Sequence, residues 1–165
     1  LQASKKPVAV LVAEGSKTPT LLEQVDRNGA YRTYFTAGGQ SVTFRNGFVT
    51  ATRGLGHDLM SASWGQTHML ISTKRAGSGR KVMRFLTGEG GTVALEFTCS
   101  VTLGGTEQMT SGELNINTRV MHEACTGDGY SFTNGYQVAP SGMVVSSRQW
   151  LGPISGSVAI DQLRL

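Results

Sequence analysis

Short runs of alternating apolar and polar residues, separated by glycine-containing turns, recur about every ten residues along the chain. The clearest run comprises residues 40–45, the pair Asn46-Gly47 and residues 48–53. Asn-Gly supplies the two positive φ angles of a type I′ turn, whose twist suits the strands on either side. This segment therefore predicts a two-stranded antiparallel hairpin.

The predicted hairpin has one apolar face. Closing the turn places Phe44 opposite Val49 and Val42 opposite Ala51, with all four side chains on one side of the sheet. The side chains expected on the other side are those of Thr43, Arg45, Phe48 and Thr50. This division predicts a half-buried hairpin whose apolar side faces a core.

Two further Asn-Gly pairs, at residues 28–29 and 134–135, mark turns between strand-like runs. The other expected strands include residues 68–73, 80–86, 92–101, 113–124, 143–150 and 158–165. Only residues 59–64 and 20–25 could form a helical turn or two, because no periodicity of about 3.6 residues extends over a helix-length segment.

About ten strands without helical crossovers should pair antiparallel with their neighbours in sequence. A sheet of that size has exposed edges unless it closes on itself or splits into two layers. We therefore predict an all-β fold, an antiparallel meander that forms a closed or partly open β-barrel or a sandwich. Little helix is expected, and residues 1–165 should form a single β domain.

The composition suits this fold and points to anionic partners. Hydrophobic residues make up 39% and charged residues 16% of the chain, which has 22 glycines and a net charge of +4. A modest positive charge favours membrane head groups, acidic glycans or nucleic acid. Nucleic acid is not expected, because no aromatic platform is interleaved with basic residues.

The one basic cluster of note contains Lys74, Arg75, Arg80 and Lys81. It could bind a phosphate, an acidic sugar or a lipid head group. The alternative is a solvated hairpin tip whose charges discourage edge-to-edge association of the sheet.

The two cysteines, Cys99 and Cys125, bear on the cellular compartment. An even cysteine count in an oxidising space predicts one disulfide, whereas two buried free thiols remain the alternative. No CxxC spacing is present, which disfavours a redox or zinc motif.

The sequence has no nucleophile elbow, phosphate-binding loop or metalloprotease motif. We therefore expect a protein without catalytic activity, cofactor or metal. One alternative is a polysaccharide-modifying hydrolase with a cryptic carboxylate site made from two of Glu96, Glu123, His122 and Asp58. Glu96 and Glu123 would lie on neighbouring strands if the cysteines are bridged, although both are expected on the solvated face. Another alternative is a lipid-carrying barrel.

Three stretches together resemble the YjbF/GfcB family of lipoproteins, which are encoded with exopolysaccharide and group 4 capsule secretion systems. The first is Thr36–Leu59, which contains the hairpin and the motif TRGLGHDL. The second is the cysteine pair, with Cys125 closing a Glu-Ala-Cys end. The third is Ser146–Pro153, of sequence SSRQWLGP, followed by Gly156 and a final strand.

The resemblance implies an acylated protein that is tethered to the outer membrane and faces the periplasm. It also implies a barrel-like β fold, no known catalytic activity, and polysaccharide or envelope secretion proteins as partners. The chain begins at Leu1 without a lipidated cysteine, so we expect a processed product whose anchor lies outside it.

Four residues near these motifs are candidates for ligand binding: Arg53, Asp58, Arg148 and Trp150. An arginine fork could hold backbone carbonyls or a carboxylate such as that of Asp58. The indole of Trp150 could anchor the core or stack on a sugar.

Overall fold

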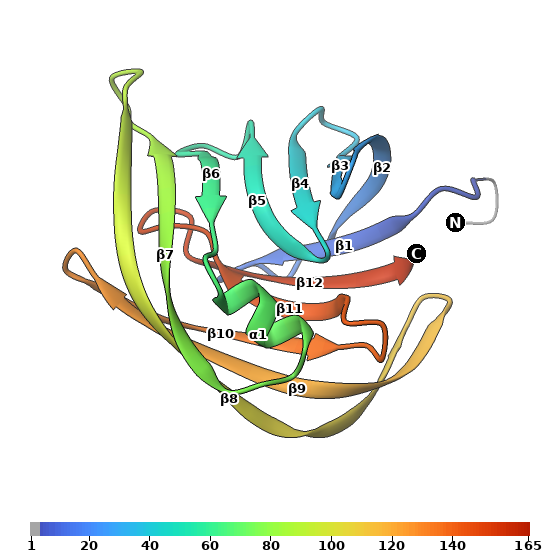
Figure 1. Ribbon diagram of the computed structural model, residues 1–165. Helices are drawn as coiled ribbons and strands as arrows, with labels where there is room; N and C mark the ends of the chain where they lie inside the picture. Colours follow the sequence, from blue (N-terminus) through green and yellow to red (C-terminus); the bar gives the residue numbers. More distant parts are fainter. Residues whose placement is uncertain (1–3) are drawn as a thin grey trace.

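Twelve antiparallel strands form one sheet that curls into a nearly closed barrel (Figure 1). The computed structural model describes residues 4–165. The strands are β1 (Val8–Ala13), β2 (Thr20–Asn28), β3 (Tyr31–Phe35), β4 (Ser41–Arg45), β5 (Phe48–Arg53), β6 (Leu59–Ser63), β7 (Gly77–Leu86), β8 (Thr92–Ser111), β9 (Leu114–Gly127), β10 (Tyr130–Val138), β11 (Val144–Trp150) and β12 (Ser157–Arg164). One short helix, α1 (Thr67–Ser72), lies between β6 and β7.

The order of strands confirms the predicted all-β meander. Neighbours in sequence pair with one another, and β1 pairs with β12, so that the first and last strands lie in the middle of the sheet order. The start of β1 at Val8 and the end of β12 at Arg164 therefore lie at the same end of the barrel (Figure 1). We call this end the terminal end and the opposite one the far end. No helix in the described part of the chain is long and apolar enough to cross a membrane.

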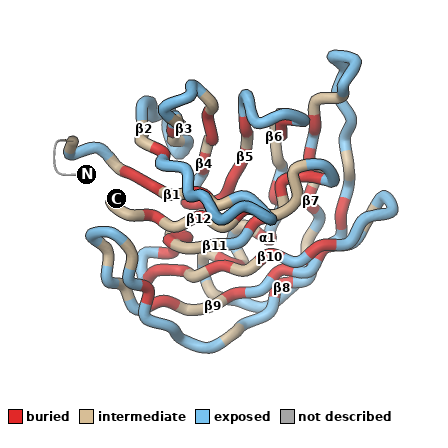
Figure 2. The backbone as a smooth tube through the Cα atoms, turned by 180° about the vertical axis from the view of Figure 1, so that it is seen from behind, coloured by how far each residue is buried: buried red, intermediate tan, exposed pale blue. Residues whose placement is uncertain are grey.

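The interior of the barrel is filled by side chains from the inward faces of the strands. Buried and exposed positions alternate along β8, β9 and β10, as expected for strands with one face in the core (Figure 2). The largest buried cluster includes Leu22, Tyr34, Phe44, Phe97 and Phe132. A second cluster lies beside α1 and includes Phe48, Trp64 and Tyr136.

Strands β5 and β6 are the two edges of the sheet order, and side chains bridge the joint between them. The Leu59 amide donates to Thr52 Oγ1 at 3.0 Å. The guanidinium of Arg53 reaches across to the carbonyl oxygens of Leu59 at 3.1 Å and Met60 at 3.4 Å. These bonds satisfy edge groups that a regular ladder would otherwise pair.

The hairpin between β4 and β5 has the predicted type I′ turn. Asn46 and Gly47 have φ angles of 53° and 87°, and Phe44 lies opposite Val49. A Cβ at Gly47 would lie 2.2 Å from the Val144 carbonyl oxygen, so the close approach of β11 also requires glycine here.

Beyond the first pairs the predicted register is wrong. The register shifts by one residue, and Val42 lies opposite Thr52 instead of Ala51. On the edge of β5 that faces away from β4, the Val49 amide donates to the buried side chain of Gln149 at 2.9 Å, and Gln149 Nε2 donates to the Gly47 carbonyl at 2.9 Å. The extra residue of β5 is Thr50, whose Oγ1 donates to the Thr43 carbonyl of β4 at 3.2 Å, and β5 bulges there.

Phe48 was expected on the polar face, and this prediction is also wrong. Its side chain is fully buried, with ring centroids 4.7 Å from Trp64 and 5.3 Å from Tyr136. The hairpin therefore packs apolar groups on both sides near its turn, where β6 and α1 cover it.

Several other expected elements differ from the structure. Residues 68–73 form most of α1 instead of a strand, because Thr67 and Ile71 are buried one helical turn apart and Thr67 Oγ1 donates to the Trp64 carbonyl at 2.7 Å. Residues 59–64 and 20–25 belong to β6 and β2 instead of helical turns. The β2–β3 turn falls at residues 29–30, one residue later than predicted.

Asn134-Gly135 is not a turn but lies inside β10. Asn134 is 3% exposed, and its side chain binds a buried carboxylate and a backbone amide of β11. Tertiary partners therefore override the local turn preference of this pair.

The joint between β5 and β6 generates the first prediction. Thr52→Val removes the hydroxyl that accepts from the Leu59 amide and donates to Asp58, so two buried groups lose a partner. We expect a loss of about 1–3 kcal/mol in the free energy of unfolding, measured in urea, and faster hydrogen exchange of the Leu59 amide. Thr133→Val, at an exposed position of β10, should change stability by less than about 0.5 kcal/mol. Equal protection of the Leu59 amide in wild type and Thr52→Val would contradict this account of the joint.

Candidate functional site

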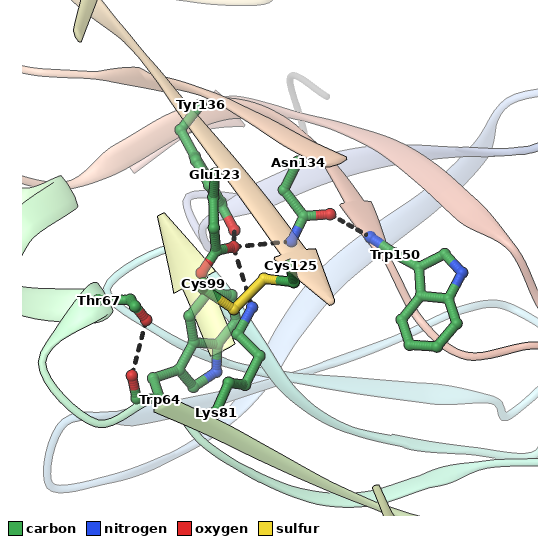
Figure 3. Close-up of a disulfide and its surroundings, with 9 residues drawn as sticks. All are labelled: Trp64, Thr67, Lys81, Cys99, Glu123, Cys125, Asn134, Tyr136 and Trp150. Atoms are coloured by element: carbon green, nitrogen blue, oxygen red, sulfur yellow. Dashed lines mark hydrogen bonds and ion pairs between the residues drawn. A yellow bond between two sulfur atoms is a disulfide. The ribbon is translucent and has the colours of Figure 1, made fainter. Parts of the chain in front are cut away.

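A buried ion pair lies inside the barrel next to the disulfide (Figure 3). Lys81 of β7 and Glu123 of β9 approach to 2.9 Å between Nζ and Oε1, and their side chains are 1% and 0% exposed. Charged groups this deep are stable only when they are paired and hydrogen-bonded.

Glu123 Oε1 accepts two further hydrogen bonds. Asn134 Nδ2 donates to it at 2.9 Å and the Tyr136 hydroxyl at 2.8 Å. Asn134 Oδ1 in turn accepts from the backbone amide of Trp150 at 2.8 Å. The network thus connects β7, β9, β10 and β11 through one carboxylate oxygen (Figure 3).

The ring of Trp64 also contacts the Lys81 ammonium group. Its Nζ lies 3.5 Å from the centroid of the Trp64 ring, a cation–π arrangement. Burial lowers the pKa of Lys81, and the nearby carboxylate of Glu123 partly offsets this effect. Burial also raises the pKa of Tyr136 well above its usual value, and the charge of Glu123 adds to the rise.

The disulfide between Cys99 and Cys125 forms as predicted, and it joins directly opposed positions of β8 and β9. The two sulfurs and a carboxylate oxygen of Glu123 lie within 4.8 Å of one another. Since both sulfurs are bonded to each other, neither is available as the thiolate that a metal ion would need.

The expectation that Glu96 and Glu123 both face solvent is wrong for Glu123. The two residues do lie on neighbouring strands, but Glu96 is exposed and pairs with Arg80 at 2.8 Å while Glu123 points inward. The pattern of alternation could have shown this, because Glu123 lies two residues before the buried Cys125 and so shares its side of the strand. The two carboxylates face opposite sides of the barrel wall and form no pair.

The predicted basic cluster is likewise divided. Lys81 is inside the barrel and Arg80 is outside, since they are consecutive residues of β7. Lys74 and Arg75 belong to the connection between α1 and β7, where Arg75 Nε donates to Thr73 Oγ1 at 3.3 Å. A hairpin tip with four basic side chains is therefore not present at residues 74–81.

Asp58 organises the loop between β5 and β6 at the far end. Its carboxylate accepts hydrogen bonds from the amides of Gly54 at 2.8 Å and Leu55 at 3.1 Å and from Thr52 Oγ1 at 3.2 Å. Together with Arg53 at the adjacent joint, it has clear structural contacts, and a role of either residue in ligand binding stays a prediction.

The other two candidates, Arg148 and Trp150, lie on β11. Arg148 is exposed and reaches Glu14 at 3.4 Å. The half-buried Trp150 ring stacks on Phe132 with centroids 4.2 Å apart and planes 10° apart. This contact makes Trp150 part of the aromatic core, and stacking on a sugar stays a prediction.

A cavity of about 340 Å³ lies at the terminal end, and the analysis of the sequence missed it. Arg27 and Arg32 line it from the β2–β3 hairpin, Arg45 from the end of β4, and His68 from α1. The buried Gln162 of β12 also borders it. The Asn-Gly pair at residues 28–29 could have revealed part of this site, because the hairpin that it marks brings two arginines together.

These features define a class of protein: a disulfide-bonded β-barrel with a buried polar network inside and a basic cavity at one end. The chain belongs to the YjbF family, described as group 4 capsule polysaccharide lipoprotein gfcB, YjbF, whose model matches residues 1–163. This match confirms the resemblance noted in the sequence.

Among solved structures, the hypothetical lipoprotein YmcC from Escherichia coli K12 is similar to this chain. The TM-score is 0.86 at 15% sequence identity, and the match covers 99% of this chain and 86% of that one. At such low identity the likeness shows a shared fold. A comparison with curated protein sequences gives no match.

The buried ion pair generates the second prediction. Lys81→Met leaves the Glu123 carboxylate buried without its counter-charge, so we expect a loss of about 3–5 kcal/mol in the free energy of unfolding, measured in urea at neutral pH. Lys81→Met combined with Glu123→Gln should recover much of that loss. Arg84→Met, at an exposed position of the same strand, should cost less than about 0.5 kcal/mol. A cost for Lys81→Met no larger than for Arg84→Met would contradict the importance of the pair.

The third prediction concerns alkaline pH. The folded state raises the pKa of Tyr136 and so retains a proton that the unfolded state releases near pH ~10. Any stability that the hydroxyl contributes is present below that pH and declines as the pH rises above it. The difference in unfolding free energy between wild type and Tyr136→Phe should therefore shrink as the pH is raised from about 9 to about 11, measured by urea titration. A difference that stays constant over this range would contradict the raised pKa.

Proposed function

We propose that this protein is an accessory lipoprotein of the bacterial cell envelope that assists exopolysaccharide or capsule secretion or assembly. In this proposal it acts as a single β domain that binds a glycan or a secretion partner and has no catalytic role. The observation that carries the proposal is the family match over residues 1–163.

The proposed location is the periplasmic side of the outer membrane, reached through an N-terminal lipid anchor outside this chain. A disulfide supports an oxidising compartment, because such bonds persist in the periplasm and are rare in the cytosol. An anchor attached ahead of β1 would connect to the barrel at its terminal end, because β1 begins there (Figure 1).

The contacts of two acidic residues argue against their use as catalytic groups. A carboxyl group that acts as general acid or base must be within reach of a substrate. Glu123 is fully buried and held by Lys81, Asn134 and Tyr136, and Asp58 accepts bonds from its own loop. A hydrolase with a cryptic carboxylate pair receives no support from these positions.

Deletion of the gene in its source organism tests the proposal and is the fourth prediction. We expect several-fold less polysaccharide at the cell surface, measured by uronic acid or total sugar assay of the surface fraction, and polymer retained in the cell. Re-expression of the wild-type lipoprotein should restore secretion, whereas a form directed to the periplasm without acylation should restore it only in part. Normal surface polymer in the deletion strain would refute the proposed function.

A further inference from the structure

Two arginines face each other at the terminal end of the barrel. Arg27 of β2 lies directly opposite Arg32 of β3, which in turn lies opposite the core residue Phe44. Residues directly opposite in antiparallel strands share a face, so both arginines are on the inward side of the sheet. Like charges in this position destabilise a sheet, and an anion held between them would remove the repulsion.

A third arginine, Arg45, the last residue of β4, lines the same cavity. No acidic residue is among the lining residues that the structure describes. Within residues 4–165, none of these three arginines forms an ion pair with a carboxylate. The cavity therefore concentrates positive charge that the described part of the chain does not neutralise.

Two residues that border the cavity each bury a polar atom without a hydrogen-bond partner. Gln162 is 2% exposed, yet its Oε1 accepts no hydrogen bond in the described structure, and the same is true of the buried Nε2 of His68. Such groups are costly to bury without a partner. Burial and, to a lesser extent, the charge of Arg45 lower the pKa of His68, so the imidazole is neutral at neutral pH and offers one N–H donor and one acceptor.

We propose that this cavity binds an acidic polysaccharide through a carboxylate or phosphate group held between Arg27 and Arg32, with the side chains of Gln162 and His68 turning to bond sugar hydroxyls. The inference rests on the proposed function and names the ligand class and the site. Arginine forks match carboxylate and phosphate oxygens equally well, so the shared chemistry is an oxyanion on a sugar. The cavity volume of about 340 Å³ lies within the range of about 300–1,000 Å³ usual for small-ligand pockets.

A glycan fits the lining better than a lipid does. An acyl chain needs an apolar cavity without unneutralised charge, whereas this one combines three guanidinium groups, an imidazole and amides with the apolar side chains of Phe44 and Met143. Sugars present hydroxyls and acidic groups for the polar and charged side chains. The cavity lies at the terminal end, and none of its lining residues belongs to the disulfide or to the Lys81–Glu123 pair.

Isothermal titration calorimetry with a hexamer of galacturonic acid tests the site and is the fifth prediction. We expect binding of the free acid, at least tenfold weaker binding of its fully methyl-esterified form, and weaker binding as salt is raised. Arg27→Gln combined with Arg32→Gln should weaken binding of the acid at least tenfold, and Gln162→Leu should weaken it further. Lys17→Gln combined with Arg84→Gln removes two exposed charges outside the cavity and should leave affinity within about twofold.

Backbone amide NMR shifts then locate the ligand, which should move the resonances of Gly29, Ala30 and Gly47 in wild type. Displacement by inorganic phosphate at lower concentration than by acetate would identify a phosphate as the preferred group, and the reverse order a carboxylate. Both results support the site. Equal binding of acid and ester, an equal effect of the two double variants, or binding to phosphatidylglycerol vesicles without binding to the hexamer would overturn it.

Failure of this inference can be told apart from failure of the proposed function. Full restoration of surface polysaccharide by Arg27→Gln combined with Arg32→Gln would overturn a role of the cavity in secretion while the accessory role stands. Normal secretion in the deletion strain would refute the accessory role, whatever calorimetry shows for the cavity.

Discussion

A curled sheet must satisfy the backbone groups of its two edge strands, and this requirement shapes the molecule. The pairing of β1 with β12 joins both halves of the chain into one sheet, so the edges fall to β5 and β6. Strands β5 and β6 do not pair with each other in a regular ladder of backbone hydrogen bonds. Thr52 and Arg53 supply the bonds across the joint, and Asp58 fixes the loop that brings β6 back beside β5.

The interior solves a second problem, because a barrel of this size has more space than aliphatic side chains conveniently fill. Large aromatic rings occupy much of it, and the side chains of Lys81 and Gln149 extend into it to reach Glu123 of β9 and the backbone of β5. A buried ion pair contributes little net stability compared with apolar packing, but an incorrect register would leave its charges unpaired. The polar network therefore penalises alternative pairings of β7, β9 and β10.

The sequence was sufficient to predict the fold class and the turn at residues 46–47, but it did not predict which polar side chains point into the barrel. The same Asn-Gly pair forms a turn at residues 46–47 and a strand interior at residues 134–135. The difference arises from partners distant in sequence, because Nδ2 of Asn134 donates to Glu123 and its Oδ1 accepts from the Trp150 amide. Lys81 was placed with its basic neighbours, although it shares strand alternation with the buried Met83 and Phe85. The alternation of positions along the strand was thus a better predictor of which side of the barrel a residue faces than the charge of its side chain.

The position of both chain ends has a consequence for how a polymer could approach. If the protein is held to a membrane by a lipid ahead of Val8, the basic opening faces the bilayer instead of the open periplasm. Each residue of the linker between the lipid and Val8 adds at most about 3.6 Å to the height of that opening above the lipid surface. A polysaccharide chain would then reach the cavity from the side, through the gap between the barrel and the membrane. Because the length of the linker sets the width of this gap, a shorter linker would close the gap without changing any contact within the barrel.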